Sequence, residues 1–352
     1  MIDYLRFLLF PFSLVYALVI SIRNWAYDQG LFRSVKFDLP VIVVGNLAVG
    51  GTGKSPLTEF LIRLLEKSYT LATLSRGYGR ETKGFIRVKA SDQALLVGDE
   101  PLQFKNKYPE ITVAVCEDRV KGVKILATDH DVILLDDAFQ HRALRPGLSI
   151  LLFDYESLFK PRLLLPAGNF RDSFNQRHRA DIVIVTKCPS PLPEGQRTAA
   201  LRRLQLNGQV FFSYLRYGDL YQLRQSERIE RTLTATMDVL LISGIANPAP
   251  LYQYVASKSR TVKLMAYPDH HTYSRKNIIS ILEKFKGIHS EEKILLTTEK
   301  DYQRLKVFTE QAVFPVPVWV LPVEAAFDRD DHERLSSAIL NYCGRYARRP
   351  KK

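Results

Sequence analysis

Cysteine is scarce in this 352-residue chain, which also has no internal repeat and no low-complexity segment. Its three cysteines, Cys116, Cys188 and Cys343, stand far apart without CxxC spacing, so neither a zinc site nor a disulfide framework is indicated. Acidic residues are in deficit, because 37 Asp and Glu oppose 50 Lys and Arg and leave a net charge of +13. An excess of this size indicates an anionic partner, either nucleic acid or an acidic membrane surface.

One apolar run stands at the N-terminus. Sixteen uncharged, mostly apolar residues, Phe7 to Ile22, lie between Arg6 and Arg23. As a helix they would be roughly 24 Å long, shorter than a hydrocarbon core of roughly 30 Å. No small-x-small cleavage site follows, which argues against a signal peptide. The flanking arginines favour a membrane-associated helix over residues 1–27, and a buried core helix is the alternative.

The most informative segment is a glycine-rich turn. A β-branched run at residues 41–44 precedes it and a helical pattern from Pro56 follows, which is the context of a phosphate-binding loop. Lys54 is expected to reach the β- and γ-phosphates of a nucleoside triphosphate, and the Ser55 hydroxyl to bind Mg²⁺. The cofactors predicted are therefore a nucleoside triphosphate and Mg²⁺, and the loop comprises Gly50, Gly51, Thr52, Gly53, Lys54 and Ser55. Ala48 departs from the usual pattern, which has glycine at that position.

Apolar runs alternate with helical stretches along the rest of the chain. This alternation predicts an α/β fold, namely a P-loop NTPase-like domain with a mostly parallel sheet. Aromatic and polar residues then indicate extended, hairpin-like segments, and a second alternation begins at Val239. The predicted division is an N-terminal membrane-associated helix, a P-loop domain, a hairpin-like linker and a smaller second α/β domain, over residues 1–27, 28–207, 208–233 and 234–352.

Two acidic pairs are candidate site residues. The apolar run 132–135 leads into Asp136 and Asp137, as in a second nucleotide motif that presents a carboxylate to Mg²⁺. Asp99 and Glu100 stand at a predicted helix start, where a carboxylate either caps the helix or serves catalysis. In the catalytic interpretation one acid serves the metal and the other accepts the proton of an acceptor hydroxyl.

Other motifs carry weaker signals. His270 and His271 follow Asp269, but neighbouring side chains diverge and lack zinc-protease spacing, which argues against a zinc site. Either the histidines are structural, or one imidazole polarises a carboxylate across the domain cleft. Arginines in 75–80 and 168–172 either bind phosphate groups or face solvent. Segments 185–187 and 297–302 end predicted strands and are expected to line the cleft.

Together these motifs resemble the tetraacyldisaccharide 4'-kinase family, the lipid A 4'-kinases of Gram-negative bacteria. The resemblance covers essentially the whole chain and rests on GNLAVGGTGKS (45–55), LSRGYGR (74–80), VGDEP (97–101), DDAFQHR (136–142), LPAGNFRD (165–172), DHHTYS (269–274) and TTEKDY (297–302). It implies transfer of the ATP γ-phosphate to the 4'-hydroxyl of a tetraacylated glucosamine disaccharide 1-phosphate. It also implies action at the cytoplasmic face of the inner membrane.

The resemblance also implies residue roles. Lys54 would hold the transferred phosphate, and Asp99, assisted by His270, would take the hydroxyl proton. Ser55, Glu100 and Gln140 would gather Mg²⁺, with Asp136 and Asp137 in the acidic strand-end motif. A membrane-tethered P-loop NTPase switch is the alternative, although it would need no Asp99–His270 pair. A nucleic-acid partner is not expected, because the chain shows no helicase motif set and no stacking platform.

Overall fold

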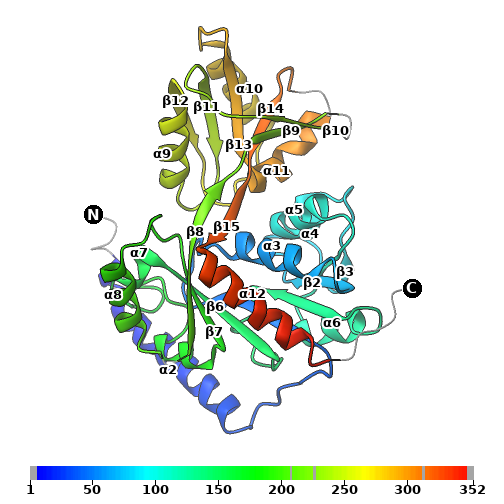
Figure 1. Ribbon diagram of the computed structural model, residues 1–352, viewed down its shortest axis with the longest axis vertical. Helices are drawn as coiled ribbons and strands as arrows, with labels where there is room; N and C mark the ends of the chain where they lie inside the picture. Colours follow the sequence, from blue (N-terminus) through cyan, green and yellow to red (C-terminus); the bar gives the residue numbers. More distant parts are fainter. Residues whose placement is uncertain (1–5, 207, 225–226, 311–313, 347–352) are drawn as a thin grey trace.

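The computed structural model describes residues 6–206, 208–224, 227–310 and 314–346. Figure 1 shows two α/β domains stacked along the long axis of the molecule, a larger one below and a smaller one above. The larger domain carries the glycine-rich turn, and the smaller one carries the segment with the paired histidines. The predicted mostly parallel α/β fold with a smaller second α/β domain is confirmed.

In the described ranges, the larger domain is built on nine strands in the order β15-β8-β7-β6-β1-β5-β2-β4-β3. The pairings are parallel except at the two edges, where β3 and β15 run antiparallel to their neighbours. The strands are β1 Val41–Asn46, β2 Leu71–Ser75, β3 Ile86–Arg87, β4 Thr112–Val115, β5 Val132–Asp136, β6 Leu148–Asp154, β7 Ile182–Thr186, β8 Gln209–Tyr217 and β15 Val323–Phe327.

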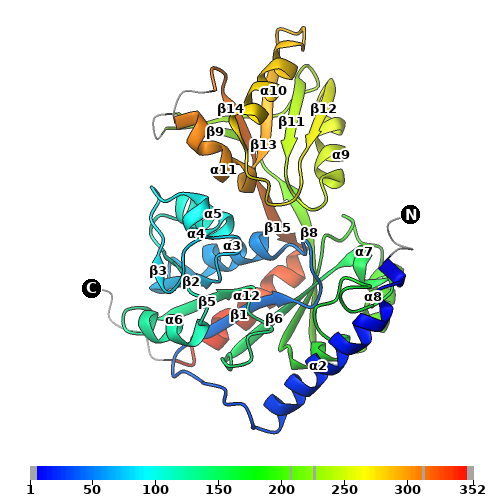
Figure 2. The same ribbon diagram turned by 180° about the vertical axis from the view of Figure 1, so that it is seen from behind.

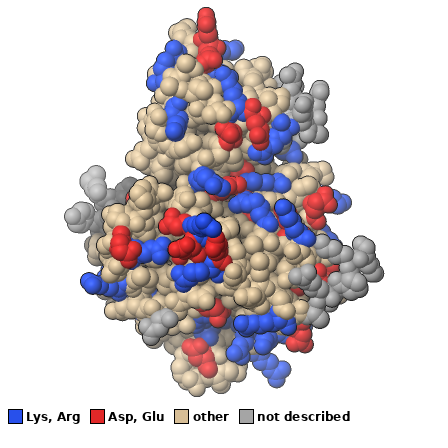
Figure 3. All heavy atoms as spheres, in the orientation of Figure 1, with Lys and Arg blue, Asp and Glu red and all other residues tan. Residues whose placement is uncertain are grey.

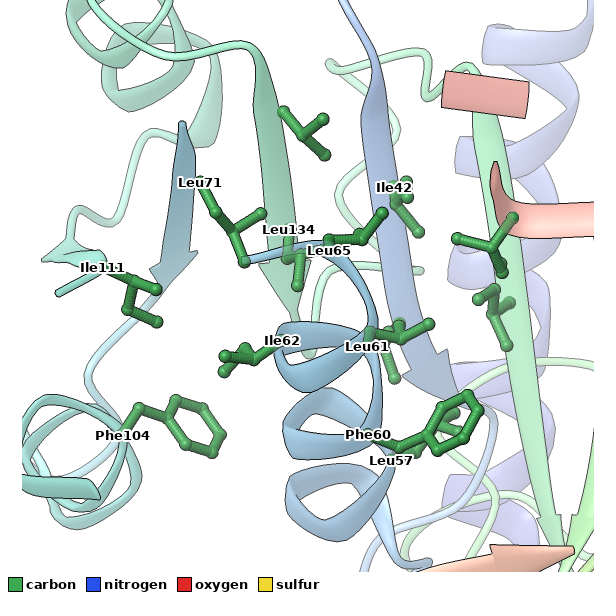
Figure 4. Close-up of a cluster of buried hydrophobic side chains, with 14 of the residues drawn as sticks. Ile42, Leu57, Phe60, Leu61, Ile62, Leu65, Leu71, Phe104, Ile111 and Leu134 are labelled. Atoms are coloured by element: carbon green, nitrogen blue, oxygen red, sulfur yellow. The ribbon is translucent and has the colours of Figure 1, made fainter. Parts of the chain in front are cut away.

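Helices cover both faces of this sheet. One face packs against α3 (Lys54–Leu65), α5 (Asp99–Lys107) and α12 (Arg329–Cys343). The other face packs against α6 (Arg119–Leu126), α7 (Tyr155–Leu158) and α8 (Glu194–Leu204). Figure 4 shows apolar side chains of α3, among them Leu57, Leu61 and Leu65, filling the space beside β1 and β5. This spacing of four residues places them on one side of the helix and anchors the residue that begins it, Lys54. The short α4 (Ala94–Val97) and the 3₁₀ helix η1 (Phe174–Arg179) lie in connections.

The smaller domain has a six-stranded sheet in the described residues, ordered β10-β9-β14-β13-β11-β12. Its strands are β9 Leu220–Arg224, β10 Glu227–Arg231, β11 Asp238–Ser243, β12 Thr261–Ala266, β13 Lys293–Thr298 and β14 Val318–Leu321. Two helices, α10 (Arg275–Lys286) and α11 (Glu299–Glu310), pack on one face, and α9 (Ala249–Lys258) packs on the other. The strands β9 and β10 pair as an antiparallel hairpin, which accounts for the predicted hairpin-like segment.

Strand pairing divides the chain differently from the predicted boundaries at 207 and 234. Strand β8 pairs with β7 in the larger domain, and β15 returns from the smaller domain to pair with β8. Helix α12 then buries Leu335 and Ile339 in the core of the larger domain. Residues 323–343 therefore belong with the larger domain, because their apolar face is completed by that sheet and not by the six-stranded one.

Helix α2 (Phe10–Asp28) lies across the outer surface of the larger domain, as Figure 2 shows. Its inward contacts are polar: Ser13 donates to the carbonyl of Leu164, and Asn24 donates to the carboxylate of Asp172. Its apolar side chains face outward, with Phe12 64% and Leu18 61% exposed. The alternative of a buried core helix is therefore wrong. In the ranges that the structure describes, no helix is long and apolar enough to cross a membrane.

Candidate functional site

The turn between β1 and α3 has the backbone conformation of a phosphate-binding loop. Gly50 and Gly53 have φ values of 106° and 80°, in the left-handed region that favours glycine. A Cβ on Gly51 would meet no heavy atom within 4 Å, so this part of the loop is open on its outer side. Helix α3 begins at Lys54, and the backbone N–H groups of its first turn are available to an anion.

Asn46, at the end of β1, organises the loop from inside. Its amide nitrogen donates to Thr52 Oγ1 at 2.8 Å and to the carbonyl of Ala48 at 2.7 Å. Its amide oxygen accepts from Lys54 Nζ at 3.4 Å and also from Arg171. The sequence did not single out Asn46, because one asparagine at a strand end carries no motif of its own.

Two segments that the sequence analysis named, 165–172 and 185–187, contact the loop from its outer side. Ala48 forms an antiparallel bridge with Phe170, and the Val49 N–H donates to the carbonyl of Asn169 at 2.8 Å. Thr186 Oγ1 donates to the carbonyl of Thr52 at 2.8 Å, and Lys187 hydrogen-bonds to that of Gly51. Backbone pairing with the 165–172 segment thus fixes the start of the loop, at the position where the usual pattern has glycine.

Strand β5 ends in the two predicted acids. Asp136 is 5% exposed and accepts from Thr58 Oγ1 at 3.3 Å, and burial raises its pKa to about 7. Asp137 lies 3.9 Å from Lys54 Nζ and pairs with Arg171. Burial alone would raise the pKa of Asp137, but Lys54 and Arg171 outweigh burial and lower it. The pKa values of the two adjacent carboxylates thus shift in opposite directions, because burial dominates at Asp136 in spite of Lys54, whereas Lys54 and Arg171 together outweigh burial at Asp137.

The first turn of α5 presents Asp99 to the smaller domain. His270 Nδ1 lies 2.8 Å from Asp99 Oδ2, and the Arg304 guanidinium contacts both carboxylate oxygens, with Nε 2.8 Å from Oδ1. Burial would raise the pKa of Asp99, but hydrogen bonds from Arg304 and His270 outweigh it and lower the pKa. His270 has a φ of 58°, a left-handed conformation that histidine adopts more readily than most residues and that is often found at functional sites.

His271 lies away from this pair. Its Nε2 is 3.2 Å from Asn277 Oδ1, and its ring stacks on Tyr267 with centroids 4.7 Å apart. Of the two neighbouring histidines, the structure therefore brings only His270 to the carboxylate across the domains, in keeping with the preference for His270 that followed from the resemblance.

Glu100 forms the second half of this cluster. It is paired with Lys300 Nζ at 3.1 Å, and Lys300 also lies 3.0 Å from His270 Nε2. Ligand atoms of Asp99, Glu100 and His270 all lie within 4.8 Å of one another, close enough to share one cation. The sequence analysis included Lys300 in the strand-end segment 297–302. It did not identify Arg304, because the partner of Arg304, Asp99, is 205 residues away in the chain.

The carboxylates fit the magnesium ion that the cofactor prediction requires. Burial and repulsion from Asp137 and Glu100 raise the pKa of Asp136, so the three acidic groups lie near one another. Oxygen donors of this kind are the ligands that Mg²⁺ prefers. Gln140 is held nearby by its Nε2, which donates to the carbonyl of Asn46 at 2.7 Å. The two acidic pairs and the loop thus converge at one end of the sheet.

Comparison with known proteins decides the family. A family model described as tetraacyldisaccharide-1-P 4'-kinase matches residues 5–343. The tetraacyldisaccharide 4'-kinase of Flavobacterium johnsoniae is 41% identical over 343 residues, which cover 96% of this chain and 97% of that protein. The chain belongs to the tetraacyldisaccharide 4'-kinase family. The Phocaeicola vulgatus tetraacyldisaccharide 4'-kinase is likewise 39% identical over 351 residues, covering 97% of this chain and 96% of that protein.

A solved structure agrees with this family assignment. The crystal structure of LpxK from Aquifex aeolicus in complex with ATP matches with a TM-score of 0.71 and 28% identity, covering 96% of this chain and 99% of that one. Membership of the tetraacyldisaccharide 4'-kinase family confirms the resemblance and the predicted enzyme class, and favours a kinase over an NTPase switch.

Proposed function

We propose that Asp99 and His270 act together on the acceptor hydroxyl in the reaction of this family, the ATP-dependent phosphorylation of the 4'-hydroxyl of a tetraacyldisaccharide 1-phosphate. One observation carries the assignment: the two side chains come from different domains and meet at 2.8 Å. Asp99 directly precedes Glu100, whose charge acts on Asp136, and the next residue, Asp137, lies 3.9 Å from Lys54 of the phosphate-binding loop. A carboxylate in this place can receive a proton while the loop holds the phosphate.

The loop residues bind the nucleotide in this proposal. Lys54 and the N–H groups of Gly51, Thr52 and Gly53 contact the phosphates of ATP, and the Ser55 hydroxyl, Glu100, Asp136, Asp137 and Gln140 hold Mg²⁺. Bound there, the ion neutralises charge on the transferred phosphoryl group. The apolar packing of α3 keeps Lys54 in place, and Asn46 holds its ammonium on the inner side of the loop.

The chemical step is an in-line displacement. The 4'-hydroxyl oxygen forms a bond to the γ-phosphorus, the bond from that phosphorus to the bridging oxygen breaks, and ADP leaves. The hydroxyl proton passes to an Asp99 oxygen. Arg304 and His270 orient the carboxylate, so the lipid hydroxyl needs to approach one of its oxygens without displacing the pair.

A double-mutant cycle on lipid phosphorylation tests this proposal. Asp99→Ala and His270→Ala are each expected to lower kcat by roughly 10²–10⁴ while ATP affinity is nearly unchanged. The double variant is expected to lose little more than the worse single variant, because two groups that act as one unit are not additive. His271→Ala is the matched control and keeps near-normal kcat, since its ring contacts Tyr267 and Asn277 instead.

Two results would contradict the assignment. Multiplicative losses in the double variant would mean that Asp99 and His270 act independently. A collapse of ATP binding in Asp99→Ala would make Asp99 a metal or structural residue.

Helix α2 is the proposed contact with the cytoplasmic face of the inner membrane. Its polar side is occupied by hydrogen bonds to the domain, for example from Tyr16 to the carbonyl of Arg171 at 2.9 Å, and its outward side is apolar. Arg6, near its start, donates to Asn169 at 2.9 Å, and Asn169 in turn accepts from the loop residue Val49. A lipid acceptor held at α2 would therefore lie close to the nucleotide site.

A further inference from the structure

A second charged cluster lies between the domains, away from the proposed reaction centre. Lys107, in the last turn of α5, places its ammonium 2.6 Å from Glu59 Oε2 and 2.7 Å from Glu299 Oε1. Both carboxylates are almost fully buried, with side chains 1% and 3% exposed. Figure 3 shows Lys and Arg side chains gathered with acidic ones where the two domains meet. The proposed chemistry uses none of these three residues.

The three residues lie on the helices whose relative positions determine the geometry of the proposed reaction centre. Glu59 lies on α3, the helix that begins with Lys54, and Lys107 lies on α5, the helix that begins with Asp99. Glu299 is the first residue of α11 in the smaller domain and directly precedes Lys300, which contacts Glu100 and His270. One ammonium thus joins the phosphate-loop helix, the helix of the proposed base and the helix of the opposite domain.

The cluster also lies beside the connection between the domains. The Val323 N–H, at the start of β15, approaches Glu299 Oε2 at 3.5 Å, and Tyr221 of β9 donates to Glu299 Oε1 at 3.4 Å. Asn106, next to Lys107 on α5, donates to Gln303, one turn after Glu299 on α11, at 2.8 Å. Figure 1 shows α5 and α11 side by side at this boundary. Lys107 therefore lies at the boundary where a change in the angle between the domains would move His270 relative to Asp99.

The cluster depends on the ammonium of Lys107, because it contains more buried carboxylates than close ammonium groups. Two buried carboxylates share one ammonium, and burial together with repulsion from Glu299 raises the pKa of Glu59 to about 7. Gln103 donates to Glu59 at 2.7 Å, and Arg63 lies 3.9 Å from it. A buried ion cluster is a weak source of stability, because an apolar cluster of similar volume is often as stable or more so. It does fix one arrangement, since moving either carboxylate away leaves a buried charge unpaired.

We propose that Lys107 is a positioning residue that holds the smaller domain against the phosphate-loop helix through Glu59 and Glu299, and so sets the closed arrangement in which His270 meets Asp99. The inference builds on the proposed Asp99–His270 pair. The two proposals can be tested separately, because Lys107 affects the angle between the domains, which can be measured as a distance, and does not take part in proton transfer.

The test compares Lys107→Met with Lys105→Met. Lys105 lies on the same helix, but its ammonium contacts the carbonyls of Pro109 and Ile111 within the larger domain, so it is a matched control. Lys107→Met is expected to lower kcat/KM for the lipid by about 10-fold to 100-fold, with ATP affinity nearly unchanged. Lys105→Met is expected to behave like the wild type.

Distance measurements between spin labels report the arrangement directly. Labels at Lys124→Cys on α6 and Ala256→Cys on α9 are both exposed and lie in different domains, and the three native cysteines are buried. Lys107→Met is expected to broaden the distance distribution, and Lys107→Arg to restore most of it together with kcat/KM. Asp99→Asn, whose amide oxygen can still accept a hydrogen bond from Arg304 or His270, is in contrast expected to lose turnover with the distribution unchanged, which separates failure of the base from failure of the alignment.

Two outcomes would overturn the inference. Lys107→Met with a lowered Tm but wild-type kcat/KM and wild-type distances would make the cluster purely structural. A loss of turnover with unchanged distances would place Lys107 in another role. If Lys107→Met does not fold, the same two measurements on Glu299→Gln test the inference. The expected loss of kcat/KM is then smaller, because the amide can still accept a hydrogen bond from Lys107.

Discussion

Replacing Asp136 by asparagine is expected to stabilise the metal-free protein while removing activity. Asp136 is buried, and burial raises its pKa from 3.8 to about 7. Because a tenfold change in the ionisation equilibrium corresponds to about 1.4 kcal/mol, keeping this carboxyl group ionised in the folded protein costs about 4 kcal/mol. Asparagine preserves the acceptor that Thr58 Oγ1 uses but carries no charge.

Because the pKa of Asp136 is raised in the folded protein, the stability difference between Asp136→Asn and the wild type depends on pH. A carboxyl group with a raised pKa in the folded state contributes no penalty below its unfolded pKa, and stability is lost as pH rises toward 7. The advantage of Asp136→Asn over the wild type is therefore about 4 kcal/mol at pH 8 and less than half of that at pH 5. In a thermal melt this corresponds to a Tm increase of roughly 5 °C at pH 8.

Asp137→Asn is the matched control with the opposite sign. Although burial raises the pKa of Asp137, Lys54 and Arg171 lower it overall, so this carboxylate stabilises the fold above its unfolded pKa and the contribution disappears as pH falls. Asp137→Asn is expected to be less stable than the wild type by an amount that is nearly constant between pH 5 and pH 8, because the contribution is lost only below the unfolded pKa of 3.8.

The assay is a series of thermal melts between pH 5 and pH 8 in EDTA without nucleotide, repeated with ATP and Mg²⁺. Turnover of Asp136→Asn is expected to fall roughly 10²-fold or more, because the variant offers a weaker metal ligand. Addition of Mg²⁺ with ATP should raise its Tm less than that of the wild type. A Tm at pH 8 equal to or below the wild-type value would refute the assignment of an uncompensated buried charge at Asp136.

Two further predictions concern the nucleotide loop and the membrane. Lys54→Ala should reduce turnover by roughly 10³-fold or more, because it removes a positive charge from the transferred phosphoryl group; near-normal turnover in a lipid phosphorylation assay would remove the loop from the mechanism. Phe12→Ser combined with Leu18→Ser should release much of the protein from vesicles of anionic lipid and raise the KM for the lipid, without changing ATP affinity. The control is Leu201→Ser on α8, which is 40% exposed; equal vesicle binding by both proteins would argue against α2 as the membrane contact.

Local sequence was enough to predict the phosphate-binding loop and the alternation that builds the sheet. Strand β1, the glycine turn and α3 are contiguous, so their order and residue types indicate the chemistry before any folding is known. The β-branched run 41–44 lies within β1, because a short run of this kind between turns has few other stable conformations. The same locality explains why Asp136 could be identified at the end of β5.

The sequence did not determine where the C-terminal segment packs. Residues 323–343 follow the second alternation along the chain, yet β15 pairs with β8 and α12 completes the core of the larger domain. An apolar helix face shows that a partner is needed but does not identify it, since several sheets in one chain offer similar surfaces. For the same reason the apolar side of α2 was compatible with a core position, and only its inward hydrogen bonds showed which side faces the protein.

The sequence by itself therefore determined the nucleotide loop, the class of fold and the family, because each depends on residues that are neighbours in the chain or on a series of such motifs. The family resemblance implied His270 as a partner of Asp99, and only the tertiary structure revealed the other contacts. Arg304 reaches Asp99 from a position 205 residues away, and Lys107 is bound by carboxylates on two different helices. Such contacts depend on the angle at which two domains meet, and that angle is set by the packing of whole elements, which no local pattern of residues encodes.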